Sequence, residues 1–248
     1  MNSPVVLITG ALAGIGRATA FAFANEGARL VVSGRRESVG RALAAELQTL
    51  GVEAEFVMAD VSREDDVRNL VDKTVERFGR LDVAVNNAGT EGQPGPLMEQ
   101  TVESYTHMFD TNVLGTFLSM KHELRVMTAQ GHGSIVNLSS TMGSRGAAGM
   151  SMYVASKHAV EGMTKAAALD SAAAGVRVNA IAPGPVETEM LDRLTGNADK
   201  RAAMVASVPL KRVGKPEEIA QAIVFVASDK AGFITGQIIN VNGGKTAS

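Results

Sequence analysis

The sequence predicts an α/β protein built around a parallel β-sheet. Short β-branched runs alternate with longer helical patterns along the chain, which is typical of βαβ units. The first run, V-V-L-I-T at Val5–Thr9, is apolar throughout, as expected of a strand that helices cover on both faces. Directly after it, a glycine-rich turn leads into helical sequence. Parallel strands joined by crossover helices explain all three observations.

Seven strands are expected, separated by helical segments. The expected strands are Val5–Thr9, Arg29–Ser33, Glu53–Met58, Asp82–Asn86, Ser134–Ser139, Arg177–Ile181 and Gln237–Val241. The expected helices are Ile15–Glu26, Glu37–Leu50, one that starts at Ser62 and carries an apolar stripe to Phe78, Val102–Gln130, Tyr153–Ala174 and one that starts at Pro216. Residues 187–207 lack a regular pattern, and we expect them to form an irregular, mobile cover.

Composition limits the classes of function. The chain has 248 residues and no linker-like tract, which favours one domain. A net charge of −2 gives no basic surface for nucleic acid, and zero cysteines exclude disulfides and thiolate chemistry. We find neither a signal peptide nor an apolar run long enough to span a bilayer, so we expect a cytoplasmic protein. The four histidines lack metal-ligand spacing, and no metal site is expected.

A tyrosine and a lysine point to proton-transfer chemistry. Tyr153 and Lys157 are four residues apart at the start of a predicted helix, so they lie on the same face. A neighbouring ammonium lowers the pKa of a phenol and makes it a better general acid or base. Ser140, at the end of a predicted strand, could hydrogen-bond the same carbonyl oxygen. By itself, the Tyr–Lys pair could equally mark a solvated helix face.

The turn after the first strand is a candidate phosphate loop. It reads T-G-A-L-A-G-I-G, with Gly10, Gly14 and Gly16 leading into a helix. Glycines let backbone N–H groups approach a pyrophosphate, which a helix N-terminus also favours electrostatically. The spacing G-x-x-x-G-x-G differs from the common G-x-G-x-x-G fingerprint, and a purely structural glycine turn is the alternative.

Taken together, these motifs resemble the short-chain dehydrogenase/reductase family. The resemblance covers essentially the whole chain, from T-G-A-L-A-G-I-G through N-N-A-G, Asn112, Ser140, Tyr153 and Lys157 to P-G-P-V-E-T and V-N-G-G. It implies a single Rossmann-like domain over residues 1–248, with a doubly wound, seven-stranded parallel sheet and helices on both faces. A dinucleotide is expected at the carboxyl ends of the strands.

The resemblance implies a catalytic set of four residues. Tyr153 protonates the substrate oxygen during reduction, and Ser140 orients the carbonyl. Lys157 lowers the pKa of Tyr153 and hydrogen-bonds the nicotinamide ribose. Asn112 holds a water that links Lys157 to solvent, or alternatively marks only a kink in its helix.

The resemblance also implies a cofactor-binding set. Asn87–Gly89 line the adenosine side, mainly through their backbone, and Asp60 reaches the adenine or only ends a strand. Thr188 contacts the carboxamide, and Pro183 and Gly184 shape the turn beneath the nicotinamide. The full set is Gly10, Leu12, Ala13, Gly14, Ile15, Gly16, Gly34, Arg35, Arg36, Asp60, Val61, Asn87, Ala88, Gly89, Tyr153, Lys157, Pro183, Gly184, Val186 and Thr188.

The end of the second predicted strand favours NADP over NAD. An acidic residue there would bind the ribose 2′-hydroxyl, but Gly34 occupies that position and Arg35 and Arg36 follow. A guanidinium suits a 2′-phosphate in charge and geometry. Ala13 stands where NADP-preferring relatives often carry a second basic residue. NAD, with the arginines as surface charge, therefore stays open.

The predicted activity is an NAD(P)-dependent oxidoreductase that interconverts a carbonyl and an alcohol. In this family Thr141, Met142, Met150, Met152 and Met190 fall at the substrate pocket, and residues 186–212 cover it. Relatives act on 3-oxoacyl esters, sugars, steroids, polyols and simple ketones, and they form dimers or tetramers, so we expect a homotetramer. The alternative is a non-catalytic, dinucleotide-binding scaffold.

Overall fold

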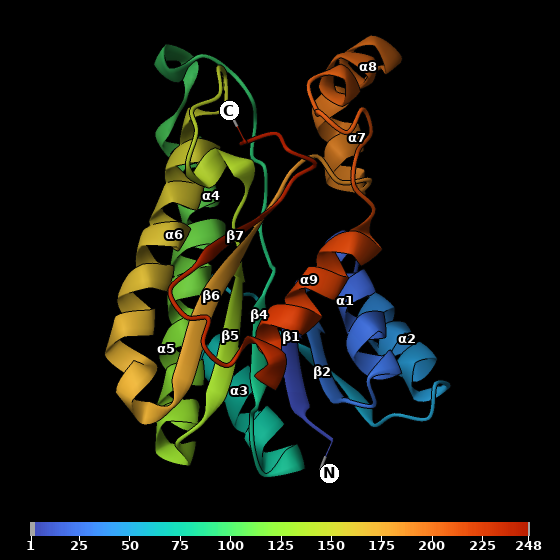
Figure 1. Ribbon diagram of the computed structural model, residues 1–248, viewed down its shortest axis with the longest axis vertical. Helices are drawn as coiled ribbons and strands as arrows, with labels where there is room; N and C mark the ends of the chain where they lie inside the picture. The colour runs from blue at the N-terminus through green and yellow to red at the C-terminus, as the bar shows by residue number, and fades with distance from the viewer. Residues whose placement is uncertain (1–2, 248) are drawn as a thin grey trace.

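The computed structural model describes residues 3–247, and its seven strands form one parallel sheet (Figure 1). The strands are β1 (Val5–Thr9), β2 (Arg29–Gly34), β3 (Ala54–Met58), β4 (Val83–Asn86), β5 (Gly133–Leu138), β6 (Val176–Pro183) and β7 (Ile238–Val241). All seven predicted strands are confirmed, with small shifts at their ends. The spatial order is β3-β2-β1-β4-β5-β6-β7, so the direction of winding reverses between β1 and β4. Open α/β sheets bind ligands at the carboxyl ends of the strands beside such a reversal.

Helices cover both faces of the sheet. One face carries α1 (Gly14–Asn25), α2 (Glu37–Gln48) and α9 (Pro216–Ala227), and the other carries α3 (Glu64–Phe78), α5 (Gly115–Gln130) and α6 (Ser151–Ser171) (Figure 1). Within residues 3–247, none of these helices combines the length and apolarity that a membrane crossing requires.

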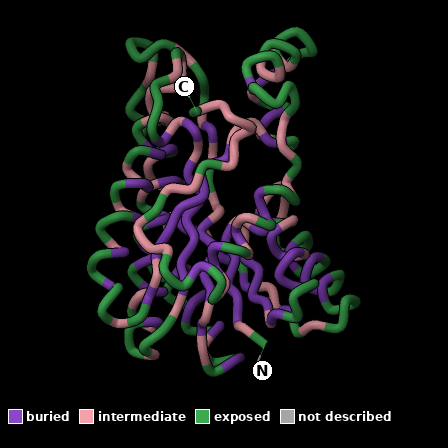
Figure 2. The backbone as a smooth tube through the Cα atoms, in the orientation of Figure 1, coloured by how far each residue is buried: buried purple, intermediate pink, exposed green. Residues whose placement is uncertain are grey.

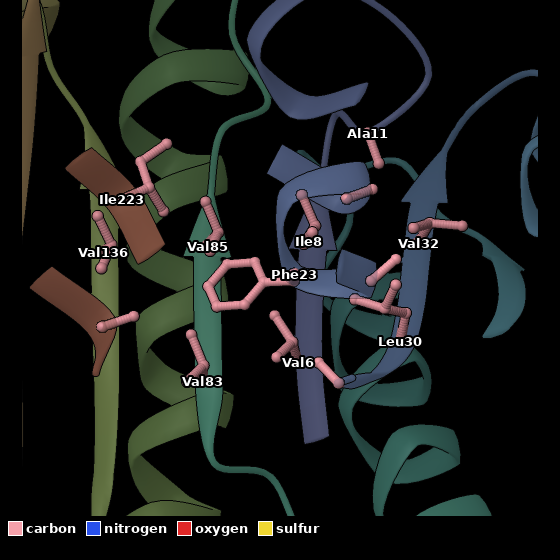
Figure 3. Close-up of a cluster of buried hydrophobic side chains, with 14 of the residues drawn as sticks. Val6, Ile8, Ala11, Phe23, Leu30, Val32, Val83, Val85, Val136 and Ile223 are labelled. Atoms are coloured by element: carbon pink, nitrogen blue, oxygen red, sulfur yellow. The ribbon is translucent and has the colours of Figure 1, made fainter. Parts of the chain in front are cut away.

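Alternating side chains of the strands divide the core into two layers. In β1, Val6 and Ile8 pack towards α1, where Phe23 lies over the sheet (Figure 3), while Val5 and Leu7 face the other layer. Both sets are fully buried. A strand buried on both faces must be apolar at every position, which is why V-V-L-I-T was informative in the sequence.

Two helical predictions were wrong in detail. The predicted helix Val102–Gln130 is divided into α4 (Val102–Phe109), a π-helical turn (Asp110–Leu114) and α5. The helix expected to start at Ser62 begins at Glu64, because Ser62 instead donates its hydroxyl to Oδ1 of Asp60 at 2.8 Å. Its own side chain is therefore engaged with the loop and does not cap the helix.

The predicted irregular cover is also wrong, because residues 187–207 contain two helices. These are α7 (Glu189–Thr195) and α8 (Ala198–Ala206), which stand apart from the sheet beyond its carboxyl edge (Figure 1). Thr188 caps α7, and Asn197 caps α8 by accepting from the Lys200 N–H at 2.9 Å. The outer helix, α8, is mostly exposed (Figure 2) and buries none of its residues.

Candidate active site

A cavity opens where β4, β5 and β6 end, beneath α7, and most of the predicted nicotinamide and substrate residues line it. It contains about 930 Å³ of space, part of which is open to solvent. The predicted residues in its wall are Ile15, Asn87, Gly89, Ser140, Thr141, Met142, Met150, Tyr153, Lys157, Pro183, Gly184, Val186, Thr188 and Met190. Residues far apart in sequence therefore meet at one edge of the sheet.

The predicted neighbourhood of Tyr153 and Lys157 is confirmed. Both residues are in the first two turns of α6, on one face, and Nζ of Lys157 lies 5.6 Å from the centre of the Tyr153 ring. The same ammonium donates to the main-chain oxygen of Leu138 at 2.8 Å. This bond ties α6 to the end of β5, the strand that leads to Ser140.

The expected lowering of the Tyr153 pKa is not found. Burial raises the pKa of Tyr153 to about 12, and the Glu91 carboxylate adds to the rise, while a hydrogen bond with the Ser140 hydroxyl opposes it. The cost of desolvating a phenolate thus outweighs the help of its neighbours. The hydrogen bond between them shows that the Ser140 and Tyr153 hydroxyls lie next to each other.

Lys157 is itself strongly affected by burial, which lowers its pKa to about 8. The carboxylate of Glu161, one helical turn further along α6, opposes this shift. Glu161 is also buried, and its Oε1 accepts a hydrogen bond from the Ser139 hydroxyl at 2.7 Å. Glu161 was not among the predicted site residues, although its i+4 spacing from Lys157 was a usable signal.

Asn112 lies in the π-helical turn and anchors the loop after β4. Its Oδ1 accepts from the Thr90 N–H at 2.8 Å, and its Nδ2 donates to the Thr90 oxygen at 2.9 Å and to Ser156 Oγ at 3.1 Å. A Cβ atom built on Gly89 would lie 3.3 Å from Asn112 Oδ1 and 3.8 Å from Lys157 Nζ. Gly89 thus keeps open the space between these two side chains. A water that links them there stays a prediction.

The glycine loop has the features needed to hold a pyrophosphate. Gly10 and Gly14 have φ values of 62° and 51°, in the left-handed region that favours glycine. A Cβ atom on Gly16 would lie 2.3 Å from the Gly10 oxygen, so the closely packed turn excludes any side chain there. The N-cap residue of α1 is Ala13, whose methyl side chain has no hydrogen-bond acceptor for the first N–H groups of the helix. These donors fit an anionic ligand.

The Asn87 side chain makes structural contacts at this loop. It donates to the oxygens of Thr9 and Gly10 at 3.2 and 2.8 Å, and the expected backbone contact of Asn87 with the cofactor stays a prediction. The amide of Asn87 therefore joins the end of β4 to the glycine loop. This contact joins the carboxyl ends of β1 and β4, the two strands between which the direction of winding reverses.

A second cavity, on the other side of Gly89, collects the residues predicted for the adenosine half of the cofactor. Those in its wall are Gly10, Leu12, Ala13, Gly34, Arg35, Arg36, Asp60, Val61, Ala88 and Gly89. Arg35 and Arg36 are exposed, and Nη1 of Arg35 lies 3.9 Å from Asp60. Although partial burial opposes the shift, hydrogen bonds from Ser62 and the charges of the nearby arginines lower the pKa of Asp60 below its usual value.

Ser33 also lines this cavity and was not among the predicted site residues. Its buried hydroxyl has no hydrogen-bond partner among the described residues.

The substrate end of the first cavity is mainly apolar. Met142, Met150 and Met190 line it as predicted, whereas Met152 lines a separate, smaller cavity beside Glu91. Eight further residues of the cavity wall were not among the predicted site residues: Thr90, Leu138, Ser139, Pro185, Leu191, Leu194, Met204 and Lys245. Three of them come from the cover, whose helices were not expected, and Lys245 comes from the chain after β7.

Comparisons with known proteins agree with this fold. A family model described as enoyl-(acyl carrier protein) reductase matches residues 10–246. Cis-4-hydroxycyclohexanecarboxylate dehydrogenase of Sinomonas cyclohexanicum is 43% identical over 98% of this chain and 96% of its own. The crystal structure of levodione reductase has a TM-score of 0.94 at 37% identity, covering 99% of this chain and 98% of the other. Gluconate 5-dehydrogenase from Burkholderia cenocepacia, in complex with NADP and tartrate, has a TM-score of 0.95 at 32% identity, covering 100% and 97%.

The fold and the cavity define a dinucleotide-binding oxidoreductase that acts on CH–OH and C=O groups. The chain belongs to the short-chain dehydrogenase/reductase family, whose members bind NAD or NADP.

Proposed function

We propose that the protein interconverts a ketone and a secondary alcohol with NADP(H), using Ser140, Tyr153 and Lys157. The observation that carries this proposal is the single cavity lined by these three residues together with Asn87, Gly89 and the Pro183–Gly184 turn. The bound dinucleotide supplies or accepts the hydride. The protein's own residues hold the carbonyl oxygen and pass a proton: Ser140 orients the oxygen, and the Tyr153 hydroxyl donates the proton during reduction. Lys157 holds the nicotinamide ribose.

Cyclic secondary alcohols are the substrates to test first. The relative from Sinomonas is named for a hydroxylated cyclohexane ring, and methionine and leucine side chains dominate the substrate end of the cavity here. A ring of this size buries apolar surface against such a wall.

The reaction is tested by following NADPH oxidation with cyclohexanone and 4-oxocyclohexanecarboxylate. An enoyl thioester serves as the third substrate, because the matching family model is described as an enoyl reductase. Tyr153→Phe should lower kcat for ketones by at least about 100-fold, because general acid catalysis contributes at least that much, while NADPH binding is retained. Reduction of the enoyl thioester alone would contradict the proposal, as would full ketone turnover by Tyr153→Phe.

The preference for NADP rests on Arg35 and Arg36, which line the adenosine cavity where no acidic residue occupies position 34. Arg35→Ala should weaken NADPH binding by about tenfold, the value of a charge-assisted hydrogen bond, and leave NADH binding nearly unchanged. Titration by cofactor fluorescence measures both. Arg41→Ala, an exposed arginine on α2 outside the cavity, is the matched control. Equal losses for the two cofactors would mean that Arg35 does not read the 2′-phosphate.

A homotetramer and a cytoplasmic location complete the proposal. Several large apolar side chains are exposed on α4, the π-helical turn and α5, among them Val102, Tyr105, Leu114 and Phe117. Such a surface suits packing against a second copy. Light scattering coupled to gel filtration tests the tetramer.

A further inference from the structure

The cavity of Tyr153 contains an unexpected cation at its substrate end. Among the described residues in its wall, Lys245 is the one charged side chain other than Lys157. It belongs to the segment after β7, which crosses the opening between α7 and the loop that precedes α6 (Figure 1). Its Nζ donates to Ser207 Oγ at 2.8 Å, at the end of α8. The lysine therefore joins the chain end to the cover of the site.

A second cation stands beside the first. The Arg145 guanidinium, from the loop between Ser140 and Tyr153, donates to the main-chain oxygen of Lys245. Partial burial and the positive charge of Arg145 both lower the pKa of Lys245. Within residues 3–247, neither cation forms an ion pair with a carboxylate. Lys245 lines the cavity, and Arg145, which is not part of its wall, adds a positive charge close by. Two neighbouring positive charges attract an anion.

The rest of the substrate end offers no other charge. Besides Tyr153 and Lys245, the cavity wall contains the large apolar side chains of Met142, Met150, Met190, Leu194 and Met204. A ligand that uses the whole cavity has a carbonyl or hydroxyl at one end, an apolar body in the middle and an anionic group at the other end. An apolar wall rejects sugars and polyols, because their hydroxyl groups would be buried without partners.

We infer that the substrate is a compact apolar ketone or secondary alcohol that carries a carboxylate, and that Lys245 and Arg145 bind this carboxylate. This inference rests on the proposed function, because it assigns the opposite end of the same substrate to Ser140 and Tyr153. Binding the carboxylate fixes the distance and direction from which the carbonyl meets Tyr153. Lys245 and Arg145 are thus specificity residues for the reaction.

The test compares matched substrates that differ in charge. Reduction rates with NADPH are measured for 4-oxocyclohexanecarboxylate, its methyl ester and 4-methylcyclohexanone. The wild-type kcat/KM should favour the carboxylate about tenfold or more over either neutral ketone, as expected for a charge-assisted contact. The preference should shrink between low and 0.5 M salt, because salt screens exposed charges. The negative charges of acetoacetyl-CoA are phosphates. This substrate therefore tests whether Lys245 and Arg145 bind a phosphate instead of a carboxylate.

Variants assign the preference to the two cations. Lys245→Met and Arg145→Gln should each bring the ratio of carboxylate to neutral kcat/KM towards one, mainly through KM, and Lys245→Arg should keep it. Lys200→Met removes an exposed lysine of α8 outside the cavity, and the ratio should stay at the wild-type value.

Three outcomes would overturn the inference. The first is equal kcat/KM for the carboxylate and the neutral ketones in the wild type. The second is a carboxylate preference that survives Lys245→Met combined with Arg145→Gln. The third is a fall in kcat/KM in Lys245→Met that occurs with acetoacetyl-CoA alone and not with 4-oxocyclohexanecarboxylate. In each case ketones are still reduced, so the proposed function stands, whereas no turnover of any ketone would contradict the proposed function itself.

Discussion

At the scale of single residues, the proposed function depends on the charge of Lys157. Burial lowers its pKa to about 8, so its ammonium is lost as the pH rises through that value. The Glu161 carboxylate partly offsets the effect of burial. We therefore expect Glu161 to act as a positioning residue, which keeps a positive charge beside Tyr153 although Glu161 does not line the cavity.

We expect Glu161→Gln to move the alkaline limb of the kcat/KM profile to lower pH. Without the carboxylate, the pKa of Lys157 falls further, so its proton is lost at a lower pH. Glutamine can still accept the hydrogen bond from Ser139, which keeps the local packing. A pH–rate profile of ketone reduction measures the shift. Asp170→Asn changes an exposed acid on the same helix and is the control. An alkaline limb that stays at the same pH, or moves to higher pH, in Glu161→Gln would disprove the role of Glu161.

At the scale of elements, an ion pair holds α7 over the cavity. Arg193 of α7 donates through Nε to Oε1 of Glu91 at 2.6 Å and through Nη2 to Oε2 at 3.3 Å. Glu91 follows β4 and is buried, while the Arg193 side chain is 58% exposed. The pair connects the cover to the loop that Asn112 anchors through Thr90.

Breaking this pair should loosen the cover. We expect Arg193→Gln to raise the KM for NADPH about threefold to tenfold, in line with the loss of a charge-assisted hydrogen bond, and to speed trypsin cleavage at Arg201 of α8. Glu91→Gln should have a similar effect, and the double variant should be little worse than either single one. Arg68→Gln, an exposed ion-pair partner on α3, is the control. Additive losses in the double variant would show that the two residues act separately.

At the scale of the whole molecule, a buried carboxyl makes stability depend on pH. Glu123 of α5 is 1% exposed, and Asn86 Nδ2 donates to its Oε2 at 2.9 Å and to Asn137 Oδ1 at 3.0 Å. Desolvation raises the pKa of Glu123 to about 7, although the bond from Asn86 opposes the shift. The folded state thus prefers the protonated acid. Its contribution to the free energy of unfolding is lost as the pH rises from the unfolded value of about 4.5 through 7.

Glu123→Gln should therefore stabilise the protein at pH 8 and change little at pH 4.5. The pKa shift corresponds to a gain in unfolding free energy on the order of 3 kcal/mol at pH 8. Glutamine keeps an acceptor for Asn86 and removes the buried charge. Urea unfolding at the two pH values, followed by circular dichroism, measures the gain. Glu76→Gln, an exposed acid on α3, should show no such difference, and a loss of stability at pH 8 in Glu123→Gln would contradict the argument.

Much of the architecture could be predicted because its signals are local. A strand buried on both faces is apolar at almost every position, as in Val5–Thr9. Glycine readily adopts positive φ, so glycines in the sequence indicate turns such as the one at Gly10 and Gly14. The helical period alone placed Lys157 beside Tyr153. A kink at Asn112 was one of the expected alternatives, but the π-helical form of this turn was not predicted, because its residues continue the helical pattern.

The sequence by itself determined the individual strands, the dinucleotide loop and the pairing of Tyr153 with Lys157, since each depends on residues close together in the chain. Only the tertiary structure decided the environment of these groups. Burial, a sum over neighbours from several elements, reversed the expected pKa shift of Tyr153. The contact of Arg193 with Glu91 joins residues 102 positions apart, and that of Arg145 with Lys245 joins residues 100 apart. No local pattern encodes such pairs, because they exist only once the loops at the carboxyl ends of the strands meet.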